Sequence, residues 1–251
     1  MTDIWQLREG ERLDDLVRDG IKIIQRTDQF CFSVDSVLLA HYVNIRAKDR
    51  IVDLGTGTGV IALLLSALGA RHITALEINP VMAELAKRNV EGNHREDYIQ
   101  VIHCDYTKAN ALFPSGYFQS VVVNPPYREV GTGNTNSEPG KALACHELGA
   151  SLRDVFQAAQ YLLVYGGRLT MVHRADRLGD LIAIGREYHM EVKRLRLVHA
   201  RPGHTASRAL LEWRYGGHPE VTVDPPLFLH NPDGSYTEEV LAIYGKGKQN
   251  E

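Results

Sequence analysis

The chain has 251 residues, of which 44% are hydrophobic and 24% are charged, a composition typical of one globular domain with at most a small appendage. The formal net charge of −3 argues against a generally basic nucleic-acid-binding protein, although a local basic face can still contact phosphates. No apolar run is long enough to span a bilayer, and the first residues lack the basic and apolar regions of a signal peptide, so we expect a cytoplasmic protein with no membrane partner.

The cysteines do not indicate a disulfide framework or a metal centre. Cys31, Cys104 and Cys145 are odd in number and scattered, which favours reduced thiols. Cys145-His146-Glu147 offers possible ligands, but no second ligand pair accompanies it, and a closed metal site needs about four ligands. We therefore expect no metal.

Residues 1–48 predict a hairpin followed by a helix. Asp19-Gly20 lies between two apolar-alternating arms, which is typical of a two-residue hairpin turn whose central residues need positive φ. Ser33 is expected to cap a helix over about residues 34–46. This piece is too short for an independent domain of normal size, and we predict that it covers one end of a cofactor site.

Residues 49–216 alternate strand and helix. Strands are predicted at 50–54, 72–77, 99–102, 119–123, 168–173, 191–198 and 207–215, and helices at 59–68, 80–91, 150–164 and 176–188. This alternation predicts an α/β fold, with a mostly parallel sheet and helices on both faces. The last two strands follow each other around Arg201-Pro-Gly203 without a helix, so they should pair antiparallel. We expect the tail, residues 217–251, to pack on this domain.

A glycine turn follows the first of these strands, in the sequence Asp53-Leu-Gly55-Thr56-Gly57-Thr-Gly59. A strand, a glycine turn and a helix make a nucleotide-cofactor cradle, because glycine lets the backbone turn sharply and lie against a ligand. The first and third glycines are closer together than in the dinucleotide fingerprint, and the Asp53 carboxylate would repel a pyrophosphate. Both features disfavour a dehydrogenase, and Asp53 suits a cationic or amine-bearing ligand.

Acidic residues follow the next two strands. Glu77, with Ile78 beside it, lies about 20 residues after Gly55, where an acidic side chain accepts both hydroxyls of a ribose. Asp105 follows the third strand and is placed to meet an adenine amino group, with Tyr106 against the ring. These residues extend the predicted cofactor site.

The sequence Asn124-Pro125-Pro126-Tyr127 directly follows an apolar strand. Two prolines fix φ and hold the preceding residue extended, so the segment presents its carbonyl groups rigidly at the carboxyl edge of the sheet. The side-chain oxygen of Asn124 and the carbonyl of Pro125 can each accept one hydrogen of an exocyclic amine, which would aim the nitrogen lone pair at a sulfonium methyl group. Tyr127 would stack on the flat substrate.

Together these residues resemble the S-adenosylmethionine-dependent amino-methyltransferases that carry an Asn-Pro-Pro-Tyr motif, over roughly residues 30–216. The resemblance implies S-adenosyl-L-methionine as cofactor and the class I methyltransferase fold, a Rossmann-like sheet of seven strands, mostly parallel, with a C-terminal antiparallel hairpin. Within that group the chain is similar to the bacterial tRNA adenine-N6 methyltransferases that act on adenine 37 of valine tRNA. The matching segments are Phe32–Leu39, Asn124–Tyr127, Cys145–Glu147, Pro225–Leu227 and Gly234–Thr237.

This resemblance implies N6-methylation of a tRNA adenine, and it places Phe32 and Asp35 near the methionine end of the cofactor. Candidate tRNA contacts are Arg194, Arg196, Arg201 and Arg208 around the last hairpin. We expect Arg194 and Arg196 to point to opposite faces of their strand, and a solvated basic face without a partner explains the set equally well. Residues 131–140 form either a lid or a disordered connection.

Other functions stay open. N-methylation of an rRNA guanine N2 or of a release-factor glutamine N5 uses the same chemistry, although the glutamine enzymes carry a substantial helical N-terminal domain, where this sequence predicts a hairpin and one helix. A protein of another class, a non-catalytic S-adenosylmethionine-binding module of an RNA-processing complex, is disfavoured by the intact Asn124 and Tyr127.

Overall fold

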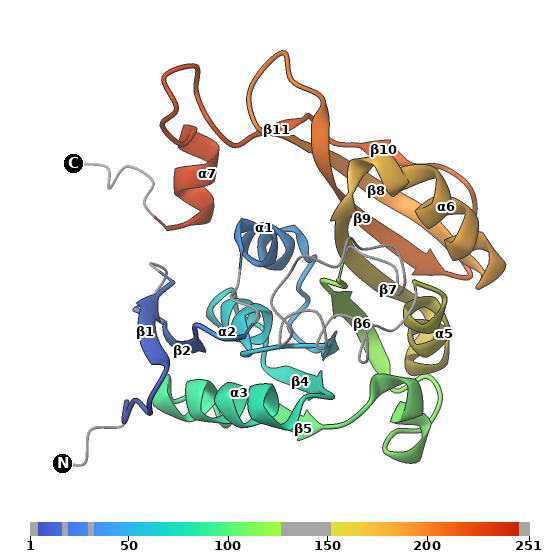
Figure 1. The fold of residues 1–251 in the computed structure, drawn as a ribbon. Helices are drawn as coiled ribbons and strands as arrows, with labels where there is room; N and C mark the ends of the chain where they lie inside the picture. The colour runs from blue at the N-terminus through green and yellow to red at the C-terminus, as the bar shows by residue number, and fades with distance from the viewer. Residues whose placement is uncertain (1–4, 17–19, 30–32, 127–151, 246–251) are drawn as a thin grey trace, which may run out of the picture.

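A computed structural model describes residues 5–16, 20–29, 33–126 and 152–245 (Figure 1). Its elements are β1 (Glu11–Asp15), β2 (Lys22–Arg26), α1 (Val34–Tyr42), β3 (Arg50–Leu54), α2 (Val60–Ala67), β4 (His72–Glu77), α3 (Pro80–Gly92), β5 (Ile99–His103), the 3-10 helix η1 (Tyr106–Ala111), β6 (Phe118–Val123), α5 (Leu152–Leu162), β7 (Leu163–Arg174), the 3-10 helix η2 (Ala175–Arg177), α6 (Leu178–Glu187), β8 (Met190–His199), β9 (Ala206–Tyr215), β10 (Thr222–Val223), β11 (Leu227–Phe228) and α7 (Glu238–Ile243).

A nine-stranded sheet forms the centre of the molecule, in the order β10-β8-β9-β7-β6-β3-β4-β5, with β11 also paired to β8. The strands from β7 to β5 are parallel, and β9 runs antiparallel between β7 and β8. The predicted α/β class and C-terminal antiparallel hairpin are confirmed. The sheet is larger than the expected seven strands because β10 and β11, in the tail, each add two residues to the edge of β8.

Helices cover both faces of the sheet (Figure 1). Side chains alternate across the pleat, so Ile51 of β3 joins the core cluster that contains α1 and α2, whereas Val52 joins the cluster that contains α5. On the second face, the rings of Phe156 and Trp213 are fully buried and meet edge to face, with centroids 5.3 Å apart. This double burial is why the central strands read as continuous apolar runs.

Two helices end earlier than predicted. The first helix, expected to reach about residue 46, ends at Tyr42, because Val43 is already extended. The helix expected over residues 150–164 ends at Leu162, and β7 begins at once, well before its predicted start at residue 168. Leu163 pairs with Phe118 of β6, so pairing across the sheet extends the strand through residues that sequence patterning assigned to the helix and a loop.

The N-terminal hairpin lies beside α3, outside the central sheet (Figure 1). β1 and β2 pair antiparallel and Gly20 has a φ of +67°, as the sequence predicts. The predicted two-residue turn is wrong, because the Leu16 N–H donates to the Ile21 carbonyl over 2.9 Å, a pairing that a two-residue turn at Asp19-Gly20 excludes. Asp19 lies outside the described residues.

Two asparagines, one in α3 and one at its C-cap, satisfy the open edge of β2. Asn89 accepts from the Ile24 N–H over 2.6 Å, and its Nδ2 donates to the carbonyls of Ile24 and Thr58 over 3.0 and 2.9 Å. Asn93, one helical turn later, accepts from the N–H of Lys22 and donates to its carbonyl. Asn89 therefore ties the hairpin directly to the glycine turn.

The tail returns to the first helix. β10 and β11 extend the β8 edge, α7 lies against α1, and His41 Nε2 is 2.8 Å from the Ile243 carbonyl oxygen (Figure 1). Across the described parts of the chain, no helix combines the length and apolar character needed to cross a membrane.

Candidate active site

The ends of four neighbouring strands bring the predicted site residues to one edge of the sheet. Leu54 of β3 is paired with Leu76 of β4 and with Val123 of β6. Gly55, Glu77 and Asn124 therefore lie at or just beyond adjacent strand ends at the carboxyl edge, where open α/β sheets bind ligands. Asp105 joins them, because Glu77 is paired with His103 of β5.

The glycine turn depends on backbone conformations that other residues rarely adopt. Gly55, Gly57 and Gly59 have φ values of +69°, +60° and +86°. The N–H groups of Gly55 and Thr56 both donate to the Leu76 carbonyl over 2.9 Å, which closes the turn onto β4. A Cβ on Gly59 would lie 3.4 Å from Cβ of Ala86 in α3, so this glycine also permits the close packing of α2 and α3.

Glu77 is a buried carboxylate held by two backbone donors. Oε2 accepts from the Gly57 N–H and Oε1 accepts from the Asn79 N–H, each over 2.8 Å. Both bonds fix the carboxylate beside the glycine turn. Each carboxylate oxygen has a second lone pair, so these bonds leave acceptor capacity for a ligand with two adjacent hydroxyls.

Asp53 is fully buried before the glycine turn. Its Oδ2 accepts from the Thr56 hydroxyl over 2.6 Å. Burial raises the pKa of Asp53 to about 7; the Thr56 hydrogen bond opposes this shift, and the Glu77 carboxylate adds to it. The structure thus places Asp53 inside the protein, where it braces the turn through Thr56.

Asp105 follows β5, as predicted, and it also caps the 3-10 helix η1. Its Oδ1 accepts from the N–H and hydroxyl of Thr107 over 3.0 and 2.7 Å, which caps η1, and its Oδ2 is 3.8 Å from Lys108 Nζ. Tyr106 is half-buried, and burial raises the pKa of its phenol well above the ordinary value. Ile78 is half-buried beside Glu77.

Asn124 contacts the first helix. Its Nδ2 donates to the hydroxyl oxygen of Ser36 in α1 over 3.3 Å, and the Asn124 side chain is half-buried. Pro125 is buried and Pro126 is exposed. Tyr127 lies outside the described residues, as do the segment 131–140 and Cys145-His146-Glu147.

Asp35 is buried in the first turn of α1, where its Oδ2 accepts from Arg208 Nε over 2.9 Å. This ion pair joins α1 to β9, so the half-buried Arg208 side chain is already paired with a buried carboxylate of its own chain. Phe32, the other residue that the resemblance assigns to the methionine end, lies outside the described residues. Arg201 is exposed in the loop between β8 and β9.

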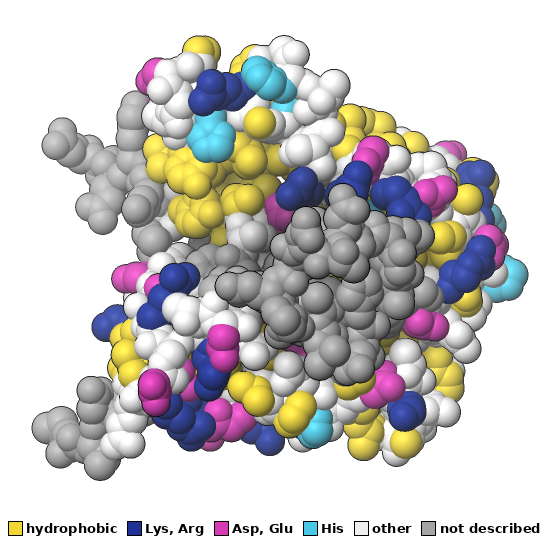
Figure 2. Space-filling view, viewed as in Figure 1, with side chains coloured by type: hydrophobic (Ala, Val, Ile, Leu, Met, Phe, Trp, Pro, Cys, Tyr) yellow, Lys and Arg dark blue, Asp and Glu magenta, His cyan; other side chains and the backbone are white. Residues whose placement is uncertain are grey.

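Two further predicted contacts anchor the tail. Arg194 pairs with Asp224 over 2.8 Å and covers the ring of Tyr42, and Arg196 pairs with Glu239 over 2.7 Å. The expectation that these arginines face opposite ways is wrong: residues two apart on a strand share a face, and both lie on the side of α1. Basic side chains lie beside acidic ones on the face seen in Figure 2, so they do not gather into one basic surface there.

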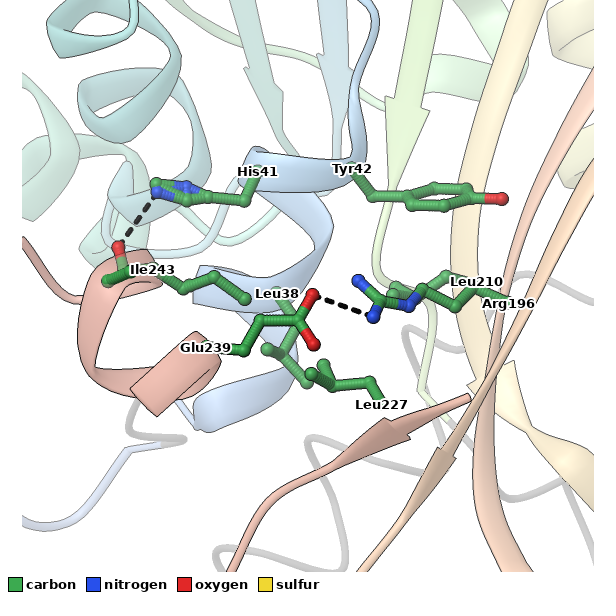
Figure 3. A pocket seen from close by; sticks show the side chains of 9 residues that line it. Leu38, His41, Tyr42, Arg196, Leu210, Leu227, Glu239 and Ile243 are labelled. Carbon is green, nitrogen blue, oxygen red and sulfur yellow. Dashed lines mark hydrogen bonds and ion pairs between the residues drawn. The ribbon is translucent and has the colours of Figure 1, made fainter. Parts of the chain in front are cut away.

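A cavity of about 390 Å³ lies between α1, the β8–β9 pair and α7 (Figure 3). Its wall includes Leu38, Tyr42, Leu210 and the Arg196–Glu239 ion pair. The lining contains neither Asn124 nor any residue of the glycine turn, so this cavity is separate from the candidate active site.

Two residues at the site escaped the sequence reasoning. Ser36 contacts Asn124, and Asn89 supports the glycine turn through the Thr58 carbonyl. Both contacts join distant parts of the chain, so no local sequence pattern predicts them. Among the described residues, no cluster of three or more His, Cys, Asp or Glu side chains is placed to hold a metal ion.

Comparisons with known proteins show the family to which the chain is similar. A family model described as Methyltransferase small domain matches residues 27–180, more than half of the chain. The tRNA1(Val) (adenine(37)-N6)-methyltransferase of Shewanella amazonensis is 39% identical over 114 residues, which are 45% of this chain and 48% of that protein. The protein of the same name from Bacteroides thetaiotaomicron is 29% identical over 209 residues, 82% of this chain and 84% of that protein. A solved structure of a predicted O-methyltransferase from Agrobacterium tumefaciens is similar with a TM-score of 0.66 and 27% identity, over 86% of this chain and 99% of that chain.

Proposed function

Because the chain belongs to the Methyltransferase small domain family, we propose that it methylates N6 of an adenine in tRNA, with adenine 37 of valine tRNA as the favoured target. The protein is an S-adenosylmethionine-dependent N-methyltransferase. The tRNA target is supported by the names of its relatives, and the residue roles by the geometry of the carboxyl edge.

The residues at this edge fit S-adenosylmethionine, which supplies an activated methyl group on a positively charged sulfur. Three glycines with positive φ leave three positions of the turn without a side chain, so a ligand can approach its backbone closely there. Glu77 is held in place with acceptor capacity for ribose hydroxyls, and Asp105 offers a carboxylate for an adenine amine. We assign the remaining cofactor contacts to the other predicted residues: Phe32, Asp35, Thr56, Ile78 and Tyr106. Asp53 is fully buried, and we assign it the role of holding the glycine turn through Thr56 rather than a direct cofactor contact.

The observation that carries the proposal is the position of Asn124 and Pro125 directly after β6, beside the strand that carries the glycine turn. Asn124 Oδ1 and the Pro125 carbonyl would accept the two hydrogens of the adenine amine. Those bonds draw the nitrogen lone pair out of conjugation with the ring and make it a nucleophile. No general base is needed beforehand, because the nitrogen becomes strongly acidic once it carries the methyl group, and its proton then leaves to water.

The same chemistry favours nitrogen over oxygen as the acceptor. A hydroxyl group has a single hydrogen and must lose it to become a good nucleophile, which calls for a base. Two fixed acceptors suit an NH₂ group, which has two hydrogens to donate. Tyr127 would stack on the base, and an anticodon-loop base is turned out of its stack at lower cost than a base in a duplex.

The test is a methyl-transfer reaction with labelled S-adenosylmethionine and undermethylated tRNA and rRNA pools, followed by identification of the modified nucleoside by mass spectrometry. We expect N6-methyladenosine in the tRNA pool. N2-methylguanosine, a ribose O-methyl nucleoside or labelled protein would overturn the proposed target. Calorimetric binding of S-adenosylhomocysteine without any methyl transfer would indicate a non-catalytic module.

A further inference from the structure

Three aromatic side chains of the C-terminal tail form a continuous stack. The ring of Tyr236 lies against that of His230, with centroids 5.0 Å apart and 20° between the planes, and against that of Tyr244, at 5.8 Å and 29°. These separations are those of offset stacking, in which each ring covers only part of its neighbour. Tyr236 is accordingly 43% exposed. The tail therefore presents flat aromatic surface on the outside of the molecule.

The stack lies at the carboxyl edge of the sheet, which also carries the candidate active site. β8 is antiparallel to β9, and β9 is antiparallel to β7, so β8 runs in the same direction as β6. The tail joins the carboxyl end of β8, where Phe228 is paired with His199 and the His230 N–H donates to the Ala200 carbonyl over 3.0 Å. At about 4.8 Å between strands, the end of β8 lies about 14 Å from the end of β6 and Asn124.

The other end of the stack lies beside the first helix. The carbonyl oxygen of Ile243, the residue before Tyr244, is 2.8 Å from Nε2 of His41 in α1. At about 1.5 Å per residue, His41 lies about 8 Å along this helix from Ser36, which contacts Asn124. A single strand with about 3.4 Å between stacked nucleotides spans these distances with about four nucleotides. Nucleotides next to a base held at Asn124 can therefore reach the stack.

An arginine without an ion pair lies beside the stack. A Cβ on Gly234, two residues before Tyr236, would lie 3.5 Å from Nη2 of Arg201 in the β8–β9 loop. Arg201 is exposed and forms no ion pair within the described ranges of the chain. The nearby Asp233 carboxylate accepts from the N–H and hydroxyl of Ser235, over 2.9 and 2.6 Å. His and basic side chains lie over these two loops, next to an apolar patch of the tail (Figure 2).

This combination suits unpaired RNA. Proteins bind single strands by stacking bases on aromatic rings and by setting basic side chains against the phosphates. A duplex offers no free base faces, because its bases already stack on one another. Stacking is also tolerant of sequence, since every base has a flat face. The surface would therefore favour a loop over a duplex without reading its sequence.

We propose that the stack of His230, Tyr236 and Tyr244, together with Arg201, binds the unpaired nucleotides that flank the target adenine. This inference rests on the proposed methylation of tRNA. The rings would stack on neighbouring bases and Arg201 would contact a phosphate. None of these residues touches the reacting atoms, so their loss should weaken tRNA binding and leave the methyl-transfer step unchanged.

The experiment compares Tyr236→Leu, Tyr236→Phe and Tyr165→Leu by fluorescence anisotropy with a labelled valine tRNA transcript and by steady-state methyl transfer. Tyr236→Leu keeps an apolar side chain but removes the flat face, and we expect Kd and KM for tRNA to rise about tenfold, with kcat and KM for S-adenosylmethionine unchanged. Tyr236→Phe retains the ring and should bind as the wild type does. Tyr165 is 79% exposed near the start of β7, at the opposite edge of the sheet, so Tyr165→Leu should leave tRNA binding unchanged.

Arg201→Gln tests the charged part of the surface. It should weaken tRNA binding and lower the slope of log affinity against log salt concentration by about one, as expected for one lost phosphate contact. Tyr236→Leu should leave that slope unchanged. Thermal melting of each variant shows whether the tail remains folded.

The outcomes separate the inference from the proposed function. Wild-type Kd and KM for tRNA in Tyr236→Leu would overturn the inference and leave tRNA methylation standing. An equal loss of binding in Tyr236→Phe, or a loss of kcat and melting temperature in Tyr236→Leu, would also overturn it, because the ring would then serve only the packing of the tail. If the wild type neither binds nor methylates tRNA, the proposed function fails and the inference fails with it.

Discussion

The buried carboxyl of Asp53 makes the stability of this protein depend on pH in an unusual direction. Its pKa in the folded protein is about 7, mainly because burial disfavours the charged form. In the unfolded chain the pKa of an aspartate is about 4. Between these values the native state holds a proton that the unfolded state has released. The free energy of unfolding therefore falls as pH rises through this window, and the contribution of Asp53 is constant above the folded pKa.

The size of the effect follows from the difference between the two pKa values. About three pKa units at about 1.4 kcal/mol each give a loss of about 4 kcal/mol between about pH 4 and pH 7. No correction for solvent screening applies, because Asp53 is fully buried. Asp53→Asn has a similar shape and cannot titrate, so it should lack this pH dependence.

The assay is urea denaturation of the wild type and Asp53→Asn from pH 4.5 to 8.5, and the measured quantity is the difference between their free energies of unfolding. Other titrating groups largely cancel in this difference. We expect the wild type to lose about 1.4 kcal/mol per pH unit relative to the variant up to about pH 7, and then no more. A difference that is flat or rises with pH would refute the reasoning. Thr56→Val removes the hydroxyl that lowers the pKa of Asp53, so the slope should extend to higher pH.

Three further predictions test separate parts of the account. Asn124→Ala should abolish methyl transfer and leave calorimetric binding of S-adenosylhomocysteine largely intact; loss of that binding would contradict the division between cofactor and substrate sites. Asn89→Ala removes three buried hydrogen bonds and should cost about 2–4 kcal/mol in urea denaturation, and a loss below about 1 kcal/mol would show that the hairpin is held by other contacts. Gly59→Ala forces a Cβ into a left-handed conformation and should cost about 1–2 kcal/mol, whereas Gly179→Ala, in α6 with open space around it, should be neutral or stabilising.

Much of the fold was predictable because its strands are short apolar runs bounded by turn residues. β3 and β4 have the predicted bounds, and the other core strands apart from β7 differ by a residue or so at their ends. Local pattern could not predict β10 and β11, since two-residue strands have no periodicity. It also missed the early start of β7, which pairing with β6 decides.

In the candidate active site, too, features set by local sequence were predictable and contacts between distant segments were not. The sequence predicts a sharp glycine turn with Glu77 beside it. The structure agrees, since Gly55, Gly57 and Gly59 have positive φ values and Glu77 is buried next to the turn. Contacts between distant segments were not predictable. The pairing of Arg196 with Glu239 is the clearest case. The sequence around β8 predicts a basic patch, but in the folded protein Arg194 and Arg196 pair with acidic residues of the C-terminal tail.

The most direct test of the central claim uses a valine tRNA transcript with adenine at position 37 and a matched transcript with guanine there. The methylated nucleoside and its position are identified by mass spectrometry after reaction with the wild type and with Asn124→Ala. The account predicts N6-methyladenosine at position 37 with the wild type alone, and no product from the guanine transcript. Undiminished methylation by Asn124→Ala, or methylation of the guanine transcript to the same extent, would contradict it.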